Sequence, residues 1–226
     1  MISGMISEIL SQGIVAFEVI GNIQDDELLP EEELLPEEEA ALGHVTERRR
    51  KEFSIGRSCA RRALAMLGLI PTPIVPGRQR QPLWPLGVVG SITHCTGYCA
   101  AAVAHRTRFV TIGIDAEIHD KLPEGTLDLV ALSRECEWLQ SSPNDGIHWD
   151  RVLFSVKESI YKAWFPIAGK WLGFKDVLVS FDPSSRRFRA RLLVSGPVVK
   201  GRTLTHFSGR YVIVAGRVLT AVSLQD

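Results

Sequence analysis

The stretch FVTIGIDAEIH, residues 109–119, alternates apolar side chains with polar or small ones and therefore predicts a β-strand. Successive side chains on a strand point to opposite faces, so Asp115 and Glu117 share one face, and the other is apolar (Ile112, Ile114, Ala116 and Ile118). Two carboxylates so placed repel each other unless a cation separates them, and hard oxygen ligands favour Mg²⁺. The alternative interpretation is a solvated outer face of an antiparallel sheet.

A second stretch, HWDRVLFSVKESIYKAW at residues 148–164, has the period of an amphipathic helix. Its apolar stripe runs through Val152, Val156, Ile160 and Ala163. The opposite side carries two lysines, a carboxylate and an aromatic ring: Lys157, Glu158, Tyr161 and Lys162. Such a face suits a cleft that holds phosphates and a metal. An ordinary solvated face with a Glu158–Lys162 ion pair is the alternative.

A helical pattern also covers residues 40–67, with a break expected near Gly43. It is rich in basic residues, and four of its arginines fall on the half of the helix that faces the core: Arg49, Arg50, Arg57 and Arg61. Arginines beside a core stripe need anionic partners, because an unpaired desolvated charge is costly. The partners are either carboxylates of the chain or phosphates gripped by two parallel hydrogen bonds.

The turn SITHCTGY, residues 91–98, follows a predicted short strand at residues 88–91. It offers hydroxyl, imidazole and backbone donors, which suit a phosphate group; a buried, hydrogen-bonded histidine is the alternative. No Gly-x-Ser-x-Gly elbow, phosphate-binding loop of the Gly-x-x-x-x-Gly-Lys type or Gly-x-Gly-x-x-Gly fingerprint occurs in the chain. The sequence therefore indicates neither a serine hydrolase nor a dinucleotide-binding fold.

The remaining pattern favours an α+β protein over a βαβ series. Residues 1–23 are strand-like, and residues 24–39 form an acidic stretch in which LLPEEE occurs twice, each proline suiting a helix N-terminus. A turn is expected at residues 143–146. After Gly173 the chain is β-rich, with strands predicted at residues 174–181, 188–194 and 203–207 and a hairpin of 210–214 and 217–224 joined by a tight turn at Ala215-Gly216.

Composition sets the class of protein. The chain has 226 residues, 45% of them hydrophobic, and its 26 basic residues balance 26 acidic ones, so a nucleic-acid partner is not expected. Four cysteines without a Cys-x-x-Cys pair indicate a reducing compartment. The first twenty residues lack the basic start of a signal peptide, and no apolar run spans a bilayer. We expect a cytoplasmic protein without a membrane partner.

Taken together, the order and spacing of the motifs resemble the 4′-phosphopantetheinyl transferases of the surfactin-synthetase type. Gly-Ile-Asp-Ala-Glu at 113–117, Lys-Glu-Ser-x-Tyr-Lys at 157–162 and Ser-Ile-Thr-His at 91–94 are similar to three signature blocks of that family. The surroundings Trp84-Pro85, residues 148–151, 162–166 and 171–174 look like its actinobacterial branch. The resemblance covers about residues 36–224.

The resemblance implies a fold of two similar subdomains, residues 1–110 and 111–226, related by a pseudo-twofold axis, each a small antiparallel sheet packed on a long helix. It implies a monomer that transfers the 4′-phosphopantetheine moiety of coenzyme A to a serine of apo acyl or peptidyl carrier proteins and releases 3′,5′-ADP. Mg²⁺, with Mn²⁺ as an alternative, would be held by Asp115, Glu117 and Glu158. Coenzyme A is the co-substrate.

The same resemblance assigns roles to individual residues. Glu158, directly or through a metal-bound water, would take the proton from the carrier serine. The metal and Lys157 would neutralise charge on the leaving 3′,5′-ADP, and Lys162 would contact the phosphates. The coenzyme A contacts would come from Arg49, Arg57, Gly77, Arg78, Thr93, His94, Asp115, Lys157, Glu158, Tyr161, Lys162 and Trp171. A core role for Trp171 is the alternative to its lining the pantetheine channel.

One loop departs from the family pattern of a basic residue followed by Gly-x-x-Gly-x-Pro. Here residues 76–82 read PGRQRQP, so that Pro76 replaces the basic residue and Arg80 the second glycine. Nucleotide contacts from this loop are therefore in question, with Arg78 or Arg80 as substitutes. Two rival functions are a magnesium-dependent phosphohydrolase or nuclease using the same carboxylates and a nucleic-acid-binding module using the arginine helix.

Overall fold

The N-terminal half is a three-stranded antiparallel sheet covered by one long helix. The computed structural model describes residues 4–21, 33–142 and 145–226. The sheet has the order β1-β3-β2, from strands β1 (Val15–Ile20), β2 (Val88–Cys95) and β3 (Tyr98–His105). Helix α2 (Glu47–Met66) packs on it, and the short helix α1 (Pro36–Leu42) precedes α2. Their shared core includes Ile55, Cys59, Leu64 and the alternating side chains of β3.

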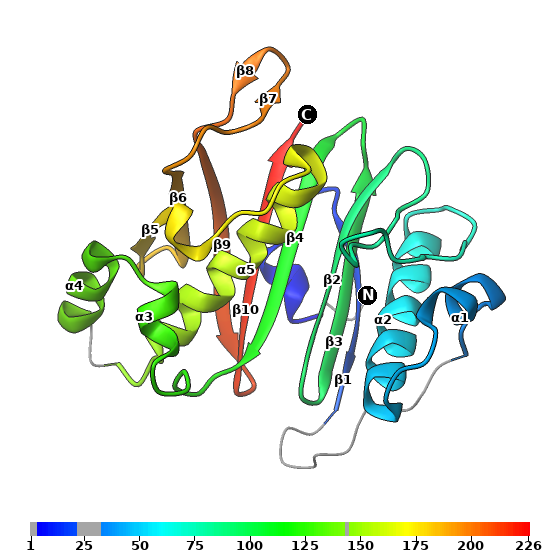
Figure 1. Cartoon of the computed structure of the whole chain (residues 1–226), viewed down its shortest axis with the longest axis horizontal. Coiled ribbons are helices and arrows are strands. Elements are labelled where there is room, and N and C mark those ends of the chain that lie inside the picture. Colours follow the sequence, from blue (N-terminus) through cyan, green and yellow to red (C-terminus); the bar gives the residue numbers. More distant parts are fainter. Residues whose placement is uncertain (1–3, 22–32, 143–144) are drawn as a thin grey trace.

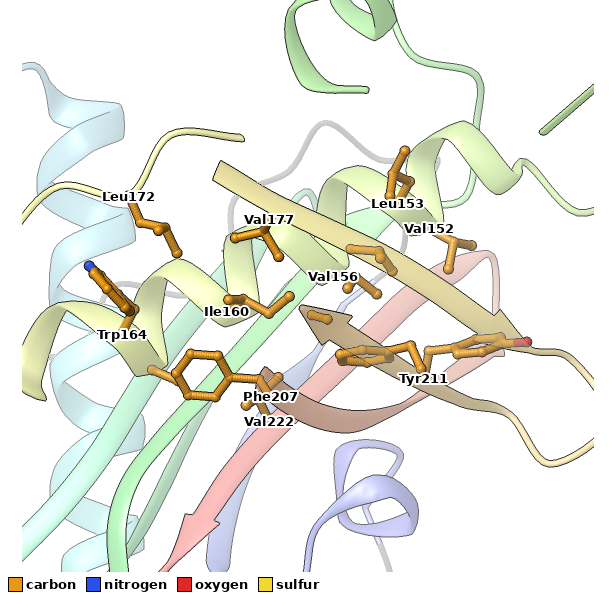
Figure 2. Close-up of a cluster of buried hydrophobic side chains, with 14 of the residues drawn as sticks. Val152, Leu153, Val156, Ile160, Trp164, Leu172, Val177, Phe207, Tyr211 and Val222 are labelled. Atoms are coloured by element: carbon orange, nitrogen blue, oxygen red, sulfur yellow. The ribbon is translucent and has the colours of Figure 1, made fainter. Parts of the chain in front are cut away.

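The C-terminal half repeats this plan on a larger scale. Its sheet has the order β4-β10-β9-β6-β5 and is antiparallel throughout, from strands β4 (Phe109–Ile118), β5 (Val177–Asp182), β6 (Arg187–Leu192), β9 (His206–Val214) and β10 (Arg217–Gln225). Helix α5 (Trp149–Ala168) lies across one face of this sheet (Figure 1). Figure 2 shows Val156 and Ile160 of α5 meeting Phe207 and Val222 of the sheet in a buried cluster.

Short elements fill the ends of the sheets. Helices α3 (Thr126–Val130) and α4 (Ser133–Ser141) precede α5, and the 3₁₀ turn η2 (Phe174–Asp176) leads into β5. Strands β7 (Val198–Val199) and β8 (Arg202–Thr203) form a small hairpin of their own. The 3₁₀ turn η1 (Ile6–Ile9), although it belongs to the N-terminal segment, packs on β9 and β10 of the other half.

The two halves lie side by side, with β2 facing β4 along a seam (Figure 1). These two strands belong to different sheets, and side chains link them: Ile114 N–H donates to Ser91 Oγ at 3.1 Å, and Ala116 N–H donates to Thr93 Oγ1 at 2.9 Å. At one end of the seam the buried Arg217 donates to the carbonyl oxygens of Gly21 and Gly97, both at 2.9 Å. The seam brings the motifs at 91–94 and 113–117 together.

The α+β class and the long elements predicted from the sequence are confirmed. Gly43, at φ 65°, separates α1 from α2, and the hairpin turn is closed by Ala215 and Gly216, both at positive φ, as the two central residues of a type I′ turn require. Pro36 begins α1, as the second LLPEEE copy predicted; the first copy lies almost entirely outside the described residues. Pro143 and Asn144 of the predicted turn also lie outside them.

Several element limits differ from prediction. Helix α5 continues past Trp164 to Ala168 with Pro166 inside its last turn, and Gly169 ends it in the left-handed conformation. The strand predicted from residue 174 begins only at Val177, after η2. The predicted strand at 203–207 is split between β8 and the start of β9. The subdomain boundary at residue 110 stays a prediction.

Candidate active site

The carboxylate of Asp115 is the centre of a polar cluster at the seam. Asp115 is 4% exposed, and its Oδ1 accepts a hydrogen bond from Lys162 Nζ at 2.7 Å while its Oδ2 accepts one from Ser155 Oγ at 2.8 Å. Thr93 Oγ1, on the opposite half, lies 3.4 Å from Oδ1 and 3.3 Å from Lys162 Nζ. One carboxylate is thereby bound from α5 and from β2 at once.

The close approach of α5 to β4 explains why Asp115 is buried. Gly113 lies two residues before it on the same strand face, and a Cβ at Gly113 would come within 1.9 Å of the carbonyl oxygen of Ser159. Only a residue without a side chain lets the helix come so near. The polar face of β4 therefore lies under α5, and the alternative of a solvated outer sheet face is wrong.

Glu117, the next residue on that face, is held by an arginine. Arg151 donates to Glu117 Oε2 at 3.0 Å, and its other guanidinium nitrogens donate to the carbonyl oxygens of Asp120 and Lys121. Burial, together with the neighbouring charge of Asp115, raises the pKa of Glu117 to about 7 against the opposing effect of Arg151. This carboxyl group can hold or release a proton near neutral pH.

Glu158 extends from α5 toward the same cluster. Burial raises its pKa, the charge of Asp115 adds to the rise, and Lys162 acts in the opposite direction. Of the predicted trio, Asp115 is thus close enough to repel both Glu117 and Glu158. Within the described ranges, however, no three His, Cys, Asp or Glu side chains are gathered into a group that could hold a metal ion.

Lys157 is placed differently from the sequence-based interpretation of an open polar face. It is 3% exposed, and its Nζ donates to Glu135 Oε2 at 2.7 Å and to the carbonyl oxygens of Val130 and Phe174. Burial lowers its pKa, and the hydrogen bond that it donates to Glu135 offsets part of that effect. Lys157 therefore joins α5 to α4 and η2, whereas Lys162, one and a half turns later, is the lysine that contacts Asp115.

The arginine helix brings cations to the other side of the cleft. Arg57 is buried, donates to the carbonyl oxygen of Ile74 at 2.6 Å and stacks over Phe53, and its burial lowers its pKa to about 10. Arg61 pairs with Glu38, a fully buried carboxylate of α1, so the predicted internal partner exists for that arginine. Arg49 is less buried, and its guanidinium lies 3.4 Å from Glu52 Oε2.

His94 connects the arginines to the carboxylate cluster electrostatically. Its surface is partly open, yet the crowded setting of the imidazole lowers its pKa by desolvation. The charges of Lys162 and Arg49 lower the pKa as well, and those of Glu52 and Asp115 raise it. Arg49, His94 and Lys162 thus act on one another across the seam, although they come from α2, β2 and α5.

A cavity of about 220 Å³ opens beside Lys162, between the loop of residues 79–82, Trp84, residues 90–92 of β2 and α5. In that loop Gly77 N–H bonds the carbonyl oxygen of Gln81, and Arg80 stands at φ 65°, in the left-handed region that favours glycine. Arg80, which stands where the family pattern has its second glycine, thus adopts a conformation that glycine favours. Arg78 is exposed on the same loop.

An aromatic pair begins at the wall of this cavity, which Tyr161 also lines. Tyr161 lies with its ring centroid 4.8 Å from that of Trp171, which is 74% exposed. The core alternative for Trp171 is therefore wrong. An open aromatic pair next to Lys162 can pack against an extended, partly apolar ligand.

Three contributors to this site were not singled out in the sequence. Ser155 lies seven residues before Lys162, hence on the same helix face, which is a signal that could have identified it. Arg151 occurs in the stretch compared with the actinobacterial branch but had no assigned role. Glu135 had no signal, because its helix was not predicted.

Comparison with known proteins agrees with this geometry. Residues 37–104 match the profile of the 4′-phosphopantetheinyl transferase N-terminal domain, and residues 111–214 match that of the 4′-phosphopantetheinyl transferase superfamily. The chain is 44% identical to 4′-phosphopantetheinyl transferase Npt of Nocardia iowensis over 97% of its own length and 99% of that protein.

Two further relatives are similarly close. The chain is 45% identical to 4′-phosphopantetheinyl transferase Svp of Streptomyces mobaraensis, over 97% of this chain and 89% of that one. It is 44% identical to 4′-phosphopantetheinyl transferase PptT of Mycobacterium tuberculosis, over 81% and 82% of the two chains. None of the helices in the described part of the chain is long and apolar enough to cross a membrane.

Proposed function

The chain belongs to the 4′-phosphopantetheinyl transferase superfamily, and from this premise we propose how its residues carry out the transfer. The enzyme moves the 4′-phosphopantetheine moiety of coenzyme A to a serine of a carrier protein. The observation that carries the assignment to the seam is the cluster of Lys162, Asp115 and Thr93, in which a cation, a carboxylate and a hydroxyl from both halves meet.

Asp115, Glu117 and Glu158 would hold Mg²⁺, or Mn²⁺ in its place. The donor chemistry fits, because carboxylates supply hard oxygen ligands and because Asp115 raises the pKa of both glutamates, a repulsion that a divalent cation relieves. In the described ranges the three carboxylates are not gathered around one point, so metal binding would require their side chains to move together. When bound, the ion supplies charge neutralisation at the pyrophosphate of coenzyme A. Arg151 fixes the direction of the Glu117 carboxylate through contacts that are independent of any ligand.

Glu158 takes the proton from the attacking serine hydroxyl. Its raised pKa brings it toward the working pH, which favours a general base. Lys162 neutralises charge on the phosphates and on the departing 3′,5′-ADP, since its Nζ already lies at the centre of the cleft. Lys157 shares this role in the family-based assignment; its buried ion pair with Glu135 supports a second role in fixing α5.

The nucleotide occupies the N-terminal side. Arg49, Thr93 and His94 would bind the 3′-phosphate, and Arg57 would contribute from its buried position next to Arg49. The loop of Gly77 and Arg78 borders the cavity that would receive the nucleotide, and the pair of Tyr161 and Trp171 would line the pantetheine arm. All four cysteines are free, which supports work in the reducing cytoplasm; we further propose that the enzyme acts as a monomer.

Incubation with coenzyme A, Mg²⁺ and an apo carrier protein, followed by intact mass measurement, tests the proposal. We expect the carrier to gain one phosphopantetheine group, to do so with Mg²⁺ or Mn²⁺, and to stay unmodified after chelation of divalent ions. Hydrolysis of coenzyme A by water alone, without a need for carrier protein, would instead indicate a phosphohydrolase. Transfer that is unaffected by chelation would contradict the metal assignment alone.

A further inference from the structure

The C-terminal sheet has a second face that α5 does not cover. Along β6 the side chains alternate strictly: Phe188, Ala190 and Leu192 are buried in the core beneath α5, whereas three arginines point the other way and are exposed (Arg187, Arg189 and Arg191). On the adjacent strand β9, Tyr211 is buried under α5 and Arg210 is exposed on the arginine face. The catalytic cleft and these arginines therefore lie on opposite faces of one sheet.

This arginine face is hollowed by a cavity of about 440 Å³. Ile9, Leu10 and Ile14, at and after η1, form an apolar wall on one side. Ser11 lies opposite the sheet in this cavity. The rest of the lining consists largely of arginines and serines of the sheet, namely Arg187, Arg189, Arg210, Ser180, Ser208 and Ser223. A volume of this size lies within the range of pockets that bind small ligands.

The charges in this cavity are unbalanced. Arg187 and Arg210 are direct cross-strand partners, an arrangement in which like charges repel. Among the described residues, the guanidinium groups of Arg187, Arg189 and Arg210 have no hydrogen-bond or ion-pair partner; the carbonyl oxygen of Arg189 accepts a hydrogen bond from Ser180 Oγ at 3.2 Å. Asp182 is the one carboxylate among the described residues of the lining, and its oxygens already accept hydrogen bonds from the hydroxyls of Ser184 and Ser185.

We propose that this cavity binds a small diphosphate-bearing anion, at a site separate from the coenzyme A cleft. A guanidinium group binds phosphate through two parallel hydrogen bonds, and three such groups on two neighbouring strands offer more donors than one phosphate can use. The Ser208 hydroxyl at the rim can donate to a remaining oxygen, whereas Ser180 already donates to the Arg189 carbonyl oxygen and Ser223 is bonded to Ser11. The apolar wall after η1 excludes water from one side, which reduces screening of the charges.

Inorganic pyrophosphate and the full-length protein provide a site-resolved test by amide NMR in metal-free buffer. We expect saturable shifts of the Ser180, Gly209 and Ser223 amides, whether or not the catalytic cleft also binds the probe. Arg189→Gln combined with Arg210→Gln should raise the dissociation constant read from these amides by roughly 10- to 100-fold. Arg202→Gln, an exposed arginine on β8 outside the cavity, is the matched control and should leave it unchanged.

Three results would overturn this proposal. The first is the absence of saturable shifts at these amides in the wild type. The second is an equal response to sodium chloride at matched ionic strength, which would mean screening alone. The third is a stronger response to a polyglutamate peptide than to pyrophosphate, which would indicate an acidic protein partner. Because the substituted side chains are exposed, the fold should persist in these variants. Arg189→Lys keeps the charge but loses the two parallel hydrogen bonds of a guanidinium group, so it should weaken binding by less than Arg189→Gln.

Discussion

In the N-terminal half, the strand that meets the seam carries hydroxyls, Ser91 and Thr93, whereas the facing strand of the C-terminal half carries carboxylates, Asp115 and Glu117. The helices that cover the two sheets also differ in the charged side chains that they carry. Helix α2 brings Arg49 and Arg57 toward the cleft, and α5 brings Glu158 with Lys162. Each half is a sheet on a helix of 20 residues.

This difference shows how a repeated plan can be divided between tasks. The N-terminal half offers cations and hydroxyl donors, which suit the phosphates of a nucleotide, and the C-terminal half offers carboxylates, which suit a metal and a proton. Neither half holds the full set, so the seam is where the chemistry becomes complete. Substitutions on the two sides should therefore fail in different ways.

The largest expected effect is on the carboxylate side. Asp115→Asn should lower kcat/KM for carrier modification by roughly 10³-fold or more, because it removes a charge that would hold the metal. The melting temperature should change little, since the lost ion pair with Lys162 is offset by relief of repulsion at Glu117 and Glu158. Intact mass measurement of the carrier follows the transfer activity, and thermal unfolding gives the melting temperature. Asp182→Asn, at an exposed position at the end of β5, is the control. Full activity of Asp115→Asn at saturating Mg²⁺ would refute the assignment of Asp115 as a metal ligand.

The two lysines of α5 should separate stability from activity. Lys157→Met leaves the buried Glu135 without its partner and should cost about 3–5 kcal/mol of unfolding free energy, measured by urea titration. Lys162→Met also removes the cation beside a buried carboxylate, but Lys162 is more open and Ser155 still donates to Asp115, so this variant should cost less unfolding free energy than Lys157→Met while it loses most transfer activity.

A double variant provides the control for Lys157. Lys157→Met combined with Glu135→Leu removes both charges, so it should recover much of the lost stability. If Lys157→Met keeps wild-type stability and loses transfer, Lys157 contacts the substrate instead of fixing the helix.

On the cationic side, Arg49→Ala should weaken coenzyme A by roughly 10- to 100-fold, the equivalent of a lost charge-assisted hydrogen bond. Dephospho-coenzyme A should be affected much less, because the proposed contact is the 3′-phosphate. Calorimetric titration of both ligands measures the difference. Arg48→Ala is a matched control, since Arg48 is 67% exposed and also pairs with Glu52. Equal losses for both ligands would place Arg49 outside the 3′-phosphate site.

The smallest effect is expected in the loop that borders the nucleotide cavity. Arg80→Gly should change the unfolding free energy by at most about 1 kcal/mol, because glycine suits φ 65° but adds freedom to the unfolded chain. Arg80→Val should be clearly destabilising there. If Arg80→Gly instead raises the Kd for coenzyme A severalfold with stability unchanged, Arg80 substitutes for the missing basic residue of this loop.

Periodicity predicted the elements that carry the chemistry. Strand β4, helix α5 and the β9–β10 hairpin have long, regular patterns, and their apolar faces lie where the patterns indicated. The core-facing positions of Arg57 and Arg61 also followed from helical spacing. Helices α3 and α4 were missed because they are short and are stabilised by tertiary contacts such as Glu135 with Lys157.

That omission had a consequence for the site. With no partner visible in the sequence, Lys157 was grouped with Lys162 on one polar face, whereas its side chain is buried in a network that involves Val130, Glu135 and Phe174. The end of α5 was missed for a different reason. A proline usually ends a helix, but Pro166 stands in the last turn, and the left-handed Gly169 supplies the actual stop.

The side-chain bonds across the seam make two amides reporters of how the halves dock. The N–H groups of Ile114 and Ala116 are protected by hydroxyls of the other half and not by a neighbouring strand. Their hydrogen–deuterium exchange should therefore follow separation of the halves, while amides between β4 and β10 follow global unfolding. A ligand that bridges the seam should slow exchange at Ile114 and Ala116 selectively, so docking can be measured without any turnover.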